Sequence, residues 1–307
     1  MKTFVLHADY SPLNFIMEGI NPSIDGNPVQ SIVLRTIRKP RIQLLLASLG
    51  LACFFPLQFF TKSTLEELRK VKSGDKVILI EDRHRPILRA LKDVLPKDVI
   101  LYLFFHTPIP ITSRSKRRLK GKSKMFNLSS FDADTRLVYP NIHIGSSFYR
   151  FAPTEMIMEK KDIKYDCFFV GMEKGRGGIL KEIRETLEKA GLKCNFIIMH
   201  NGETFVPYDQ TLQMMLESRC IVDVTLNTKG VTLRPLEALY FGKKLIVNSP
   251  DIINEMFYNP QNIFIWGKDN TDDLYDFIMS PYVPASQEVL NYYDINSWVR
   301  RFNWADK

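Results

Sequence analysis

The chain has 307 residues, of which 45% are hydrophobic and 25% charged. This composition is that of a globular protein and excludes disordered, collagen-like and low-complexity chains, and the length suits about two domains. Lys and Arg number 42 against 34 Asp and Glu, a formal net charge of +8, and such an excess points to phosphate-bearing partners only where the cations are clustered.

The cysteines are far apart in the sequence and form no CxxC pair. They are Cys53, Cys167, Cys194 and Cys220. Because no His stands at metal-ligand spacing from them, the pattern predicts neither a disulfide framework nor a structural zinc site, and it fits a reducing cytoplasm. The first residues contain no apolar core followed by a small-residue cleavage site, so no signal peptide is expected.

The first half of the chain predicts strands that alternate with helices. The expected strands are Thr3–His7, Val77–Glu81, Val99–Phe105, Thr135–Tyr139 and Ile142–Ile144. Apolar residues at 87–94 have helical spacing, and Pro96 ends that pattern. A strand–helix–strand order implies a parallel sheet, so we predict a Rossmann-like domain over residues 1–155.

One long apolar segment lies inside this half. Ile42–Phe60 has 19 residues without a charge and follows four basic residues between 35 and 41. A membrane-spanning helix needs roughly 20 apolar residues. Three interpretations stay open: a core segment of the first domain, a segment lying on the membrane with its basic flank on lipid phosphates, or a span. A span would split the first sheet, which argues against it.

The positive charge is concentrated in Ser113–Lys124, which has seven Lys or Arg and no acid in twelve residues. Because it follows a predicted strand, we expect a loop that binds anionic lipid headgroups or a pyrophosphate. Nucleic acid is a less favoured partner, since no aromatic residues are interleaved and no nucleic-acid motif is present. A merely solvated loop is the alternative. The cations expected to make contact are Arg114, Lys116, Arg117, Arg118 and Lys120.

The second half has the clearest alternation. Expected strands are Tyr165–Val170, Asn195–Met199, Ile221–Leu226, Leu245–Asn248 and Ile263–Trp266, each followed by a segment of helical periodicity. This predicts a second Rossmann-like domain over residues 156–290, with a parallel sheet covered on both faces. We expect the last segment, 291–307, to form a helix that packs back across the domain pair. The fold class is therefore α/β, with two such domains facing a central cleft.

Ligands of such sheets bind beyond the carboxyl ends of the strands, so the residues after each strand are the site candidates. Gly171 and the glycines up to Gly178 suit a close approach to a phosphate at a helix N-terminus, and Lys174 and Arg176 add charge. A plain solvated turn is the alternative.

A second candidate turn lies between Asp223 and the strand near residue 247. Thr232 and Arg234 stand in the first turn of a predicted helix, where they could face phosphate oxygens, and Glu237 could accept two hydroxyl groups of a ribose or a sugar. The alternative is that Thr232 caps the helix and Glu237 pairs with Arg234.

The segment GVTLRPLEALYFGKKLIV resembles the nucleotide-sugar motif of GT-B glycosyltransferases. With YDCFFVGMEKGRGG, NPQNIFIW and SWVRRF, it resembles bacterial enzymes that build lipopolysaccharide, capsule or other surface polysaccharides, over residues 165 to 300. The resemblance implies that Glu237 holds ribose or sugar hydroxyls, that Thr232 and Arg234 face the diphosphate, and that Lys174 and Arg176 neutralise the departing nucleotide. The commonest retaining pattern has another Glu where this chain has Lys229, so retention or inversion of the anomeric configuration stays open.

An inverting enzyme needs a base near the acceptor hydroxyl. Asp82 and His106 each follow a strand of the first domain and are the candidate bases, with a turn contact as the alternative for either. Asp132-Ala-Asp134 matches the DxD pattern with which GT-A glycosyltransferases hold a divalent metal, but Asp132 also suits a helix cap, and we expect no metal.

The hypothesis from the sequence is a metal-independent GT-B glycosyltransferase without a cofactor, which moves a sugar from a nucleotide diphosphate to a lipid-linked or saccharide acceptor. We expect it in the cytoplasm, peripheral to the inner face of the cytoplasmic membrane. A nucleotide-sugar 2-epimerase of the same architecture and a non-catalytic module that binds sugar nucleotides or polyanions remain as alternatives.

Overall fold

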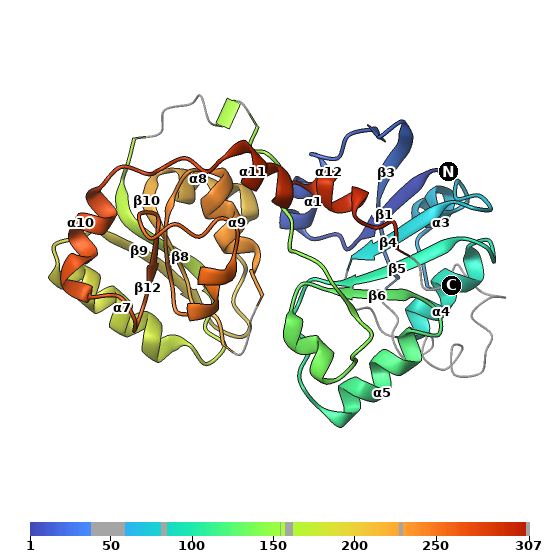
Figure 1. Cartoon of the computed structure of the whole chain (residues 1–307), viewed down its shortest axis with the longest axis horizontal. Coiled ribbons are helices and arrows are strands. Elements are labelled where there is room, and N and C mark those ends of the chain that lie inside the picture. Colours follow the sequence, from blue (N-terminus) through green and yellow to red (C-terminus); the bar gives the residue numbers. More distant parts are fainter. Residues whose placement is uncertain (38–58, 81–84, 154, 157–161, 227–229, 305–307) are drawn as a thin grey trace. The chain divides into compact units, whose positions relative to one another are not determined.

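The computed structural model describes residues 1–37, 59–80, 85–153, 155–156, 162–226 and 230–304 (Figure 1). The chain divides into two compact units, Met1–Ser146 with Ile295–Lys307, and Ser147–Asp294. The first unit thus ends before residue 155, because Tyr149 is fully buried and its backbone N–H donates to Tyr293 O of the second unit, 2.9 Å away. The C-terminal segment returns to the first unit at Ile295 rather than at residue 291.

In the described part of the first unit, seven strands form one sheet in the order β2-β3-β1-β4-β5-β6-β7. They are β1 (Thr3–His7), β2 (Ser23–Ile24), β3 (Asn27–Val33), β4 (Lys76–Ile80), β5 (Ile100–Phe105), β6 (Asn127–Ser130) and β7 (His143–Ile144). Neighbouring strands are parallel except for β2, which is antiparallel to β3. β3 pairs with one side of β1 and β4 with the other. The direction in which successive strands are added to the sheet therefore reverses between β1 and β4.

Helices cover both faces of this sheet, because its buried strands are apolar on both sides. The helices are α1 (Ser11–Met17), α3 (Lys62–Leu68), α4 (Arg85–Val94), α5 (Ser113–Lys122) and α12 (Ile295–Arg300). Apolar side chains of α3, α4 and α5 share one core cluster with Phe4 and Leu6 of β1. On β5, Phe104 points away from that cluster and meets Trp298 of α12 edge-on, with ring centroids 5.1 Å apart.

Two predictions for the first unit are wrong. Ser113–Lys122 is a helix rather than a loop, since Thr112 caps it by accepting from Ser115 N at 3.1 Å, and Lys, Arg and Leu favour helices. Thr135–Tyr139 is not a strand, because Ala133–Leu137 forms the 3-10 helix η2.

Most of Ile42–Phe60 lies outside the described residues; its last two residues, Phe59 and Phe60, are described and buried in the core cluster of the first unit. In the ranges that the structure describes, no helix is both long and apolar enough to span a bilayer.

The second unit confirms the predicted alternation. In its described part, five parallel strands form a sheet in the order β12-β11-β10-β8-β9. They are β8 (Tyr165–Met172), β9 (Cys194–Met199), β10 (Ser218–Asp223), β11 (Lys244–Val247) and β12 (Ile263–Ile265). From β8 the chain adds β9 on one side and β10 on the other, so this sheet reverses its order between β8 and β10.

Helices again cover both faces of the second sheet (Figure 1). They are α7 (Gly177–Lys189), α8 (Tyr208–Leu216), α9 (Leu233–Tyr240), α10 (Leu274–Met279) and α11 (Gln287–Tyr293). One core cluster combines apolar residues of α7 and α10 with alternate strand residues such as Cys167, Phe169 and Val222. Since α8 and α9 pack on β10 but place no residue in that cluster, they cover the opposite face.

Candidate functional site

The candidate site lies where the order of the second sheet reverses, at the carboxyl ends of β8 and β10. Open α/β sheets bind ligands at such a point, because the chain leaves the two neighbouring strands in opposite directions and opens a crevice there. Every donor-binding candidate from the sequence lies at the end of β8 or after β8 or β10: Gly171 is the second-last residue of β8, and the other candidates follow the strands.

Arg176 connects the ends of the two strands. Its Nε and Nη2 donate to Met172 O at 3.1 and 2.9 Å, and its Nη1 donates to Val224 O. Gly171 makes room for this side chain, since a Cβ at this glycine would lie 2.8 Å from Arg176 Nη2. The role of Gly171 here is therefore to leave space for the Arg176 side chain. Three N–H groups of that guanidinium donate to backbone carbonyls.

The turn after β8 already holds a carboxylate. Gly175 N and Gly177 N donate to the two oxygens of Glu173 at 2.8 and 2.7 Å, and these bonds hold the pKa of Glu173 below its usual value. Two of the N–H groups that the sequence suggested for a phosphate, those of Gly175 and Gly177, thus already bind a carboxylate of the chain. Lys174 is exposed in this turn with a φ of +47°. Glu173 is a residue that the sequence analysis did not identify.

Among the described residues, no side chain caps the N-terminus of α9. Thr232 stands at the capping position, but its hydroxyl donates to Asp223 Oδ2 at 2.8 Å instead of accepting from the helix. The alternative in which Thr232 caps α9 is therefore wrong. The first turn of α9 also contains no acidic residue, so its positive end is not neutralised from within the helix.

Arg234 lies in this first turn. Its guanidinium carbon is 5.6 Å from the centre of the Phe169 ring, over which Arg176 also lies at 5.2 Å, and its Nε is 3.9 Å from Glu237 Oε2. Its Nη1 is buried and has no hydrogen-bond partner within the described part of the chain. A buried N–H group without an acceptor costs about 1–3 kcal/mol, so this atom marks a place where a ligand oxygen would be stabilising.

Glu237 faces the interior of the second unit. It is 4% exposed, and Tyr208 donates to its Oε1 at 2.7 Å. Burial raises the pKa of Glu237, while Arg234 and the Tyr208 hydrogen bond oppose that rise. The pairing of Glu237 with Arg234 is present at long range, and hydroxyl binding by this carboxylate stays a prediction.

A small pocket with a volume of about 20 Å³, room for about one water molecule, opens to solvent beside Thr232. It lies at the carboxyl ends of β10 and β11, and Asp223, Thr225, Thr232, Ser249, Asp251 and Glu255 contribute its polar lining. Carboxylates and hydroxyls can exchange hydrogen bonds with the hydroxyl groups of a ligand.

Of the two candidate bases in the first unit, the structure describes only His106. Asp82 lies outside the described residues. His106 follows β5, and burial lowers its pKa to about 4, so its imidazole is neutral at pH 7. Its Nδ1 is buried and has no hydrogen-bond partner among the residues that the structure describes. A catalytic role for either residue stays a prediction.

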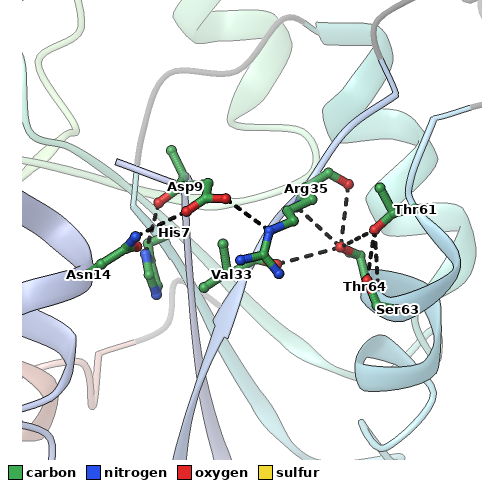
Figure 2. Close-up of polar contacts among 9 residues, drawn as sticks. His7, Asp9, Asn14, Val33, Arg35, Thr61, Ser63 and Thr64 are labelled. Carbon is green, nitrogen blue, oxygen red and sulfur yellow. Dashed lines mark hydrogen bonds and ion pairs between the residues drawn. The ribbon is translucent and has the colours of Figure 1, made fainter. Parts of the chain in front are cut away.

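Figure 2 shows a polar network at the carboxyl ends of β1 and β3 that the sequence analysis missed. Asp9 accepts from Asn14 Nδ2 at 3.0 Å and from Arg35 Nε at 2.9 Å. His7 is buried, which lowers its pKa and keeps it neutral at pH 7, and its Nδ1 lies 2.9 Å from Ala8 O. These residues are beside the point where the first sheet reverses its order, and only the strand order identifies them as candidates.

Five cations of α5 form an exposed basic face, which we call the α5 basic face. They are Arg114, Lys116, Arg117, Arg118 and Lys120. The opposite side of α5 is buried through Ser115, Leu119 and Lys122, and burial lowers the pKa of Lys122 to about 8. The helix therefore separates the predicted contact residues from its core-facing residues.

The DxD pattern serves a local role. Asp132 is 2% exposed, and its Oδ1 accepts from Asp134 N at 3.0 Å, which caps η2 as the sequence suggested. Among the described residues, no group of three or more His, Cys, Asp or Glu side chains is arranged to hold a metal ion.

Solved structures share the architecture of the whole chain. A complex of an alpha-glucosyltransferase with UDP-glucose and DNA containing an abasic site aligns over 98% of both chains, with a TM-score of 0.58 and 10% sequence identity. The complex of alpha-glucosyltransferase (AGT) with UDP aligns over the same shares with a TM-score of 0.54 and 10% identity. No family model and no curated protein matches the sequence. The chain has the GT-B fold. The predicted fold class is thereby confirmed.

We expect Gly171→Ala to lower the free energy of unfolding by roughly 1–3 kcal/mol, because its methyl group would crowd Arg176 Nη2 at 2.8 Å and the Phe169 ring at 3.3 Å. Urea denaturation followed by circular dichroism measures this. Gly178→Ala is the matched control, since nothing lies within 4 Å of a Cβ there and alanine favours α7 by about 0.5–1 kcal/mol. Unchanged stability of Gly171→Ala would contradict the role assigned to Gly171.

Proposed function

We propose that this protein is a glycosyltransferase that takes its sugar from a nucleotide diphosphate sugar. The observation that carries the proposal is Arg234, whose buried Nη1 has no acceptor among the described residues and which lies beside the uncapped N-terminus of α9. An anionic oxygen would satisfy both groups. Its place at the carboxyl edge of the second sheet is where a GT-B fold would bind a nucleotide.

The reaction fits these groups. When the bond between the anomeric carbon and the diphosphate oxygen breaks, negative charge grows on that oxygen, while the acceptor hydroxyl bonds to the carbon through its oxygen and gives its proton to a general base. A guanidinium and a helix N-terminus can stabilise this charge without a metal ion. The exposed amine of Lys174 is a further cation of the same loop region. We therefore propose a metal-independent transfer.

Two features support a nucleotide sugar as the donor. The alpha-glucosyltransferase structures, which share the fold, contain UDP or UDP-glucose. The small pocket beside Thr232 is lined by carboxylates and hydroxyls next to the proposed diphosphate position, and these groups can exchange hydrogen bonds with the hydroxyl groups of a ribose or a sugar. UDP and UDP-sugars are accordingly the first donors to test.

For the acceptor, we propose a lipid-linked or saccharide substrate of bacterial surface-glycan synthesis, used at the inner face of the cytoplasmic membrane. The support is the likeness of the segments around residues 165–300 to enzymes of surface polysaccharides, together with the α5 basic face. Each cation near an anionic membrane contributes about 1 kcal/mol of attraction, and five of them share one side of this helix.

DNA is the second candidate acceptor. An alpha-glucosyltransferase that shares this fold was solved with DNA, and an exposed row of Lys and Arg on a helix also suits DNA phosphates. The two acceptors differ in what the α5 basic face should bind, so they can be separated by direct binding measurements.

Incubation of the protein with a panel of UDP-, GDP- and CDP-sugars, with and without acceptors, tests the reaction. Release of the nucleotide only when an acceptor is present supports a transferase. A changed sugar without an acceptor would instead indicate the 2-epimerase, and tight binding without turnover would indicate a binding module. A chelator should leave the rate unchanged, and inhibition by it would contradict the metal-independent mechanism.

Arg234→Ala should raise the KM for the donor roughly 10- to 100-fold, since a charge-assisted hydrogen bond contributes about 1.5–3 kcal/mol. Steady-state kinetics with a fixed acceptor measure this. Arg184→Ala is the matched control, because this exposed arginine of α7 pairs with Glu188 at 2.7 Å, outside the site. A donor KM that is the same in Arg234→Ala and the wild type would remove Arg234 from the donor site.

Replacing Lys116, Arg117 and Lys120 with Gln should weaken binding to anionic vesicles roughly 100-fold at low salt, and less as salt rises. Vesicle co-sedimentation and fluorescence anisotropy with duplex DNA give the two affinities. The control replaces Lys181, Arg184 and Lys189 of α7, an equal change in charge on exposed positions. Loss of DNA binding alone would favour the DNA acceptor, and no loss for either ligand would contradict both roles of α5.

A further inference from the structure

Glu237 belongs to a buried chain of hydroxyl groups within the second unit. The Tyr208 hydroxyl lies 2.7 Å from Glu237 Oε1, and the Tyr149 hydroxyl lies 2.7 Å from that of Tyr208. Tyr149 is fully buried, Tyr208 is 8% exposed and Glu237 is 4% exposed. Three separate segments of the chain thus meet at one carboxylate: the segment entering the unit, the first residue of α8, and the middle of α9.

When Glu237 is ionised, the hydroxyl protons of Tyr208 and Tyr149 take one arrangement. A carboxylate only accepts, so the single hydroxyl proton of Tyr208 points to Glu237 Oε1. The Tyr208 oxygen is then available to accept from Tyr149. Each bond fixes the rotation of the next hydroxyl, and hydrogen bonds in such a chain polarise and strengthen one another.

The other oxygen of Glu237 has a different environment. Oε2 is 3.9 Å from Arg234 Nε, which is beyond hydrogen-bond distance, whereas Oε1 is held by Tyr208. Within the described residues, the carboxylate is therefore held through Oε1, and Oε2 retains acceptor capacity toward a ligand. The Nη1 of Arg234, in turn, has no hydrogen-bond partner in the part of the chain that the structure describes.

We infer that Tyr208 is a positioning residue of the donor site: its hydroxyl fixes the Glu237 carboxylate through Oε1 and leaves Oε2 to accept the hydroxyl groups of a nucleotide sugar's ribose. Tyr149 supports this arrangement by donating to Tyr208. The inference rests on the proposed function, because it assigns the support of a residue in the proposed donor site. This role differs from packing, because Tyr208 and Tyr149 act by donating hydrogen bonds from their hydroxyl groups.

Charged and titratable groups surround Glu237 on several sides. Burial raises its pKa most, Arg234 and the Tyr208 hydrogen bond lower it, and Asp223 raises it. Loss of the Tyr208 hydroxyl removes a bond that favours the ionised form, so the pKa of Glu237 should rise further. Tyr208→Phe keeps the ring and removes only this bond.

In the kinetic test, Tyr208→Phe should raise the donor KM roughly 10-fold while kcat changes by less than about threefold. The acid limb of kcat/KM for the donor should shift upward by about one pH unit. Tyr149→Phe should change both in the same direction by less. Tyr240→Phe is the control, because this neighbouring hydroxyl of α9 donates to Leu290 O at 2.6 Å rather than to Glu237.

A second test needs no activity. Wild type and Tyr208→Phe are unfolded thermally at pH values from 4 to 8. Since the folded pKa of Glu237 lies above its unfolded value, ionisation above the unfolded pKa of about 4.3 opposes folding, and more so without the Tyr208 bond. The difference in Tm between the two proteins should therefore widen as pH rises, and Glu237→Gln in both backgrounds should abolish this widening.

The outcomes separate the two claims. A Tm difference that is constant with pH, or an unchanged donor KM and pH profile in Tyr208→Phe, would overturn the positioning role and leave the transferase intact. Absence of any donor turnover in the wild type, with the pH-dependent Tm difference still present, would instead overturn the proposed function. A raised donor KM in Tyr240→Phe equal to that of Tyr208→Phe would make the effect one of packing.

Discussion

The site of the second unit depends on one arginine that holds two strand ends together. Arg176 donates to the carbonyl of Met172, the last residue of β8, and to that of Val224, which directly follows β10. Nothing in the sheet ladder joins the strands beyond their last paired residues, so the guanidinium replaces a backbone connection. Phe169 supports both this arginine and Arg234, and the absence of a side chain at Gly171 leaves the room that Arg176 needs.

This arrangement distributes the anion-binding groups between two turns. At the turn after β8, the backbone N–H groups of Gly175 and Gly177 donate to Glu173, and these two bonds lower the pKa of that carboxyl. At the start of α9, Thr232 turns to Asp223 and leaves the helix end without a cap. The first turn thus binds its own carboxylate through backbone N–H groups, whereas at the second turn the Asp223 carboxylate accepts from the Thr232 hydroxyl. Arg234 stands at the second turn, and its buried Nη1 has no hydrogen-bond partner among the described residues.

The sequence predicted the fold of the second unit well, because its strands are short, apolar and separated by clear helical periods. It predicted the first unit less well. β3 begins with Asn27 and Pro28 and continues through Gln30 and Ser31, so it lacks the apolar signal of a buried strand. The run of Lys and Arg in α5 led to the prediction of a solvated loop. The segment is a helix because Thr112 caps its N-terminus and Leu119 is buried in the core.

The site was predictable in outline but not in detail. Spacing along the chain placed Arg234 and Glu237 in one helix, and the structure brings them near each other and near Arg176. No pattern in the sequence indicates that Glu173 folds back onto its own turn, or that Tyr149 and Tyr208, far apart along the chain, meet at Glu237. Such contacts depend on the strand order and on which face each helix covers.

The central claim is that Arg234 binds the diphosphate of a nucleotide sugar at the carboxyl edge of the second sheet. The most direct measurement is a crystal structure of the protein grown with saturating UDP. The account predicts a diphosphate oxygen within hydrogen-bond distance of Arg234 Nη1, next to the first turn of α9, with Glu173 still bound to Gly175 and Gly177. A diphosphate on the turn after β8 with Glu173 displaced, or no nucleotide in the second unit, would contradict it.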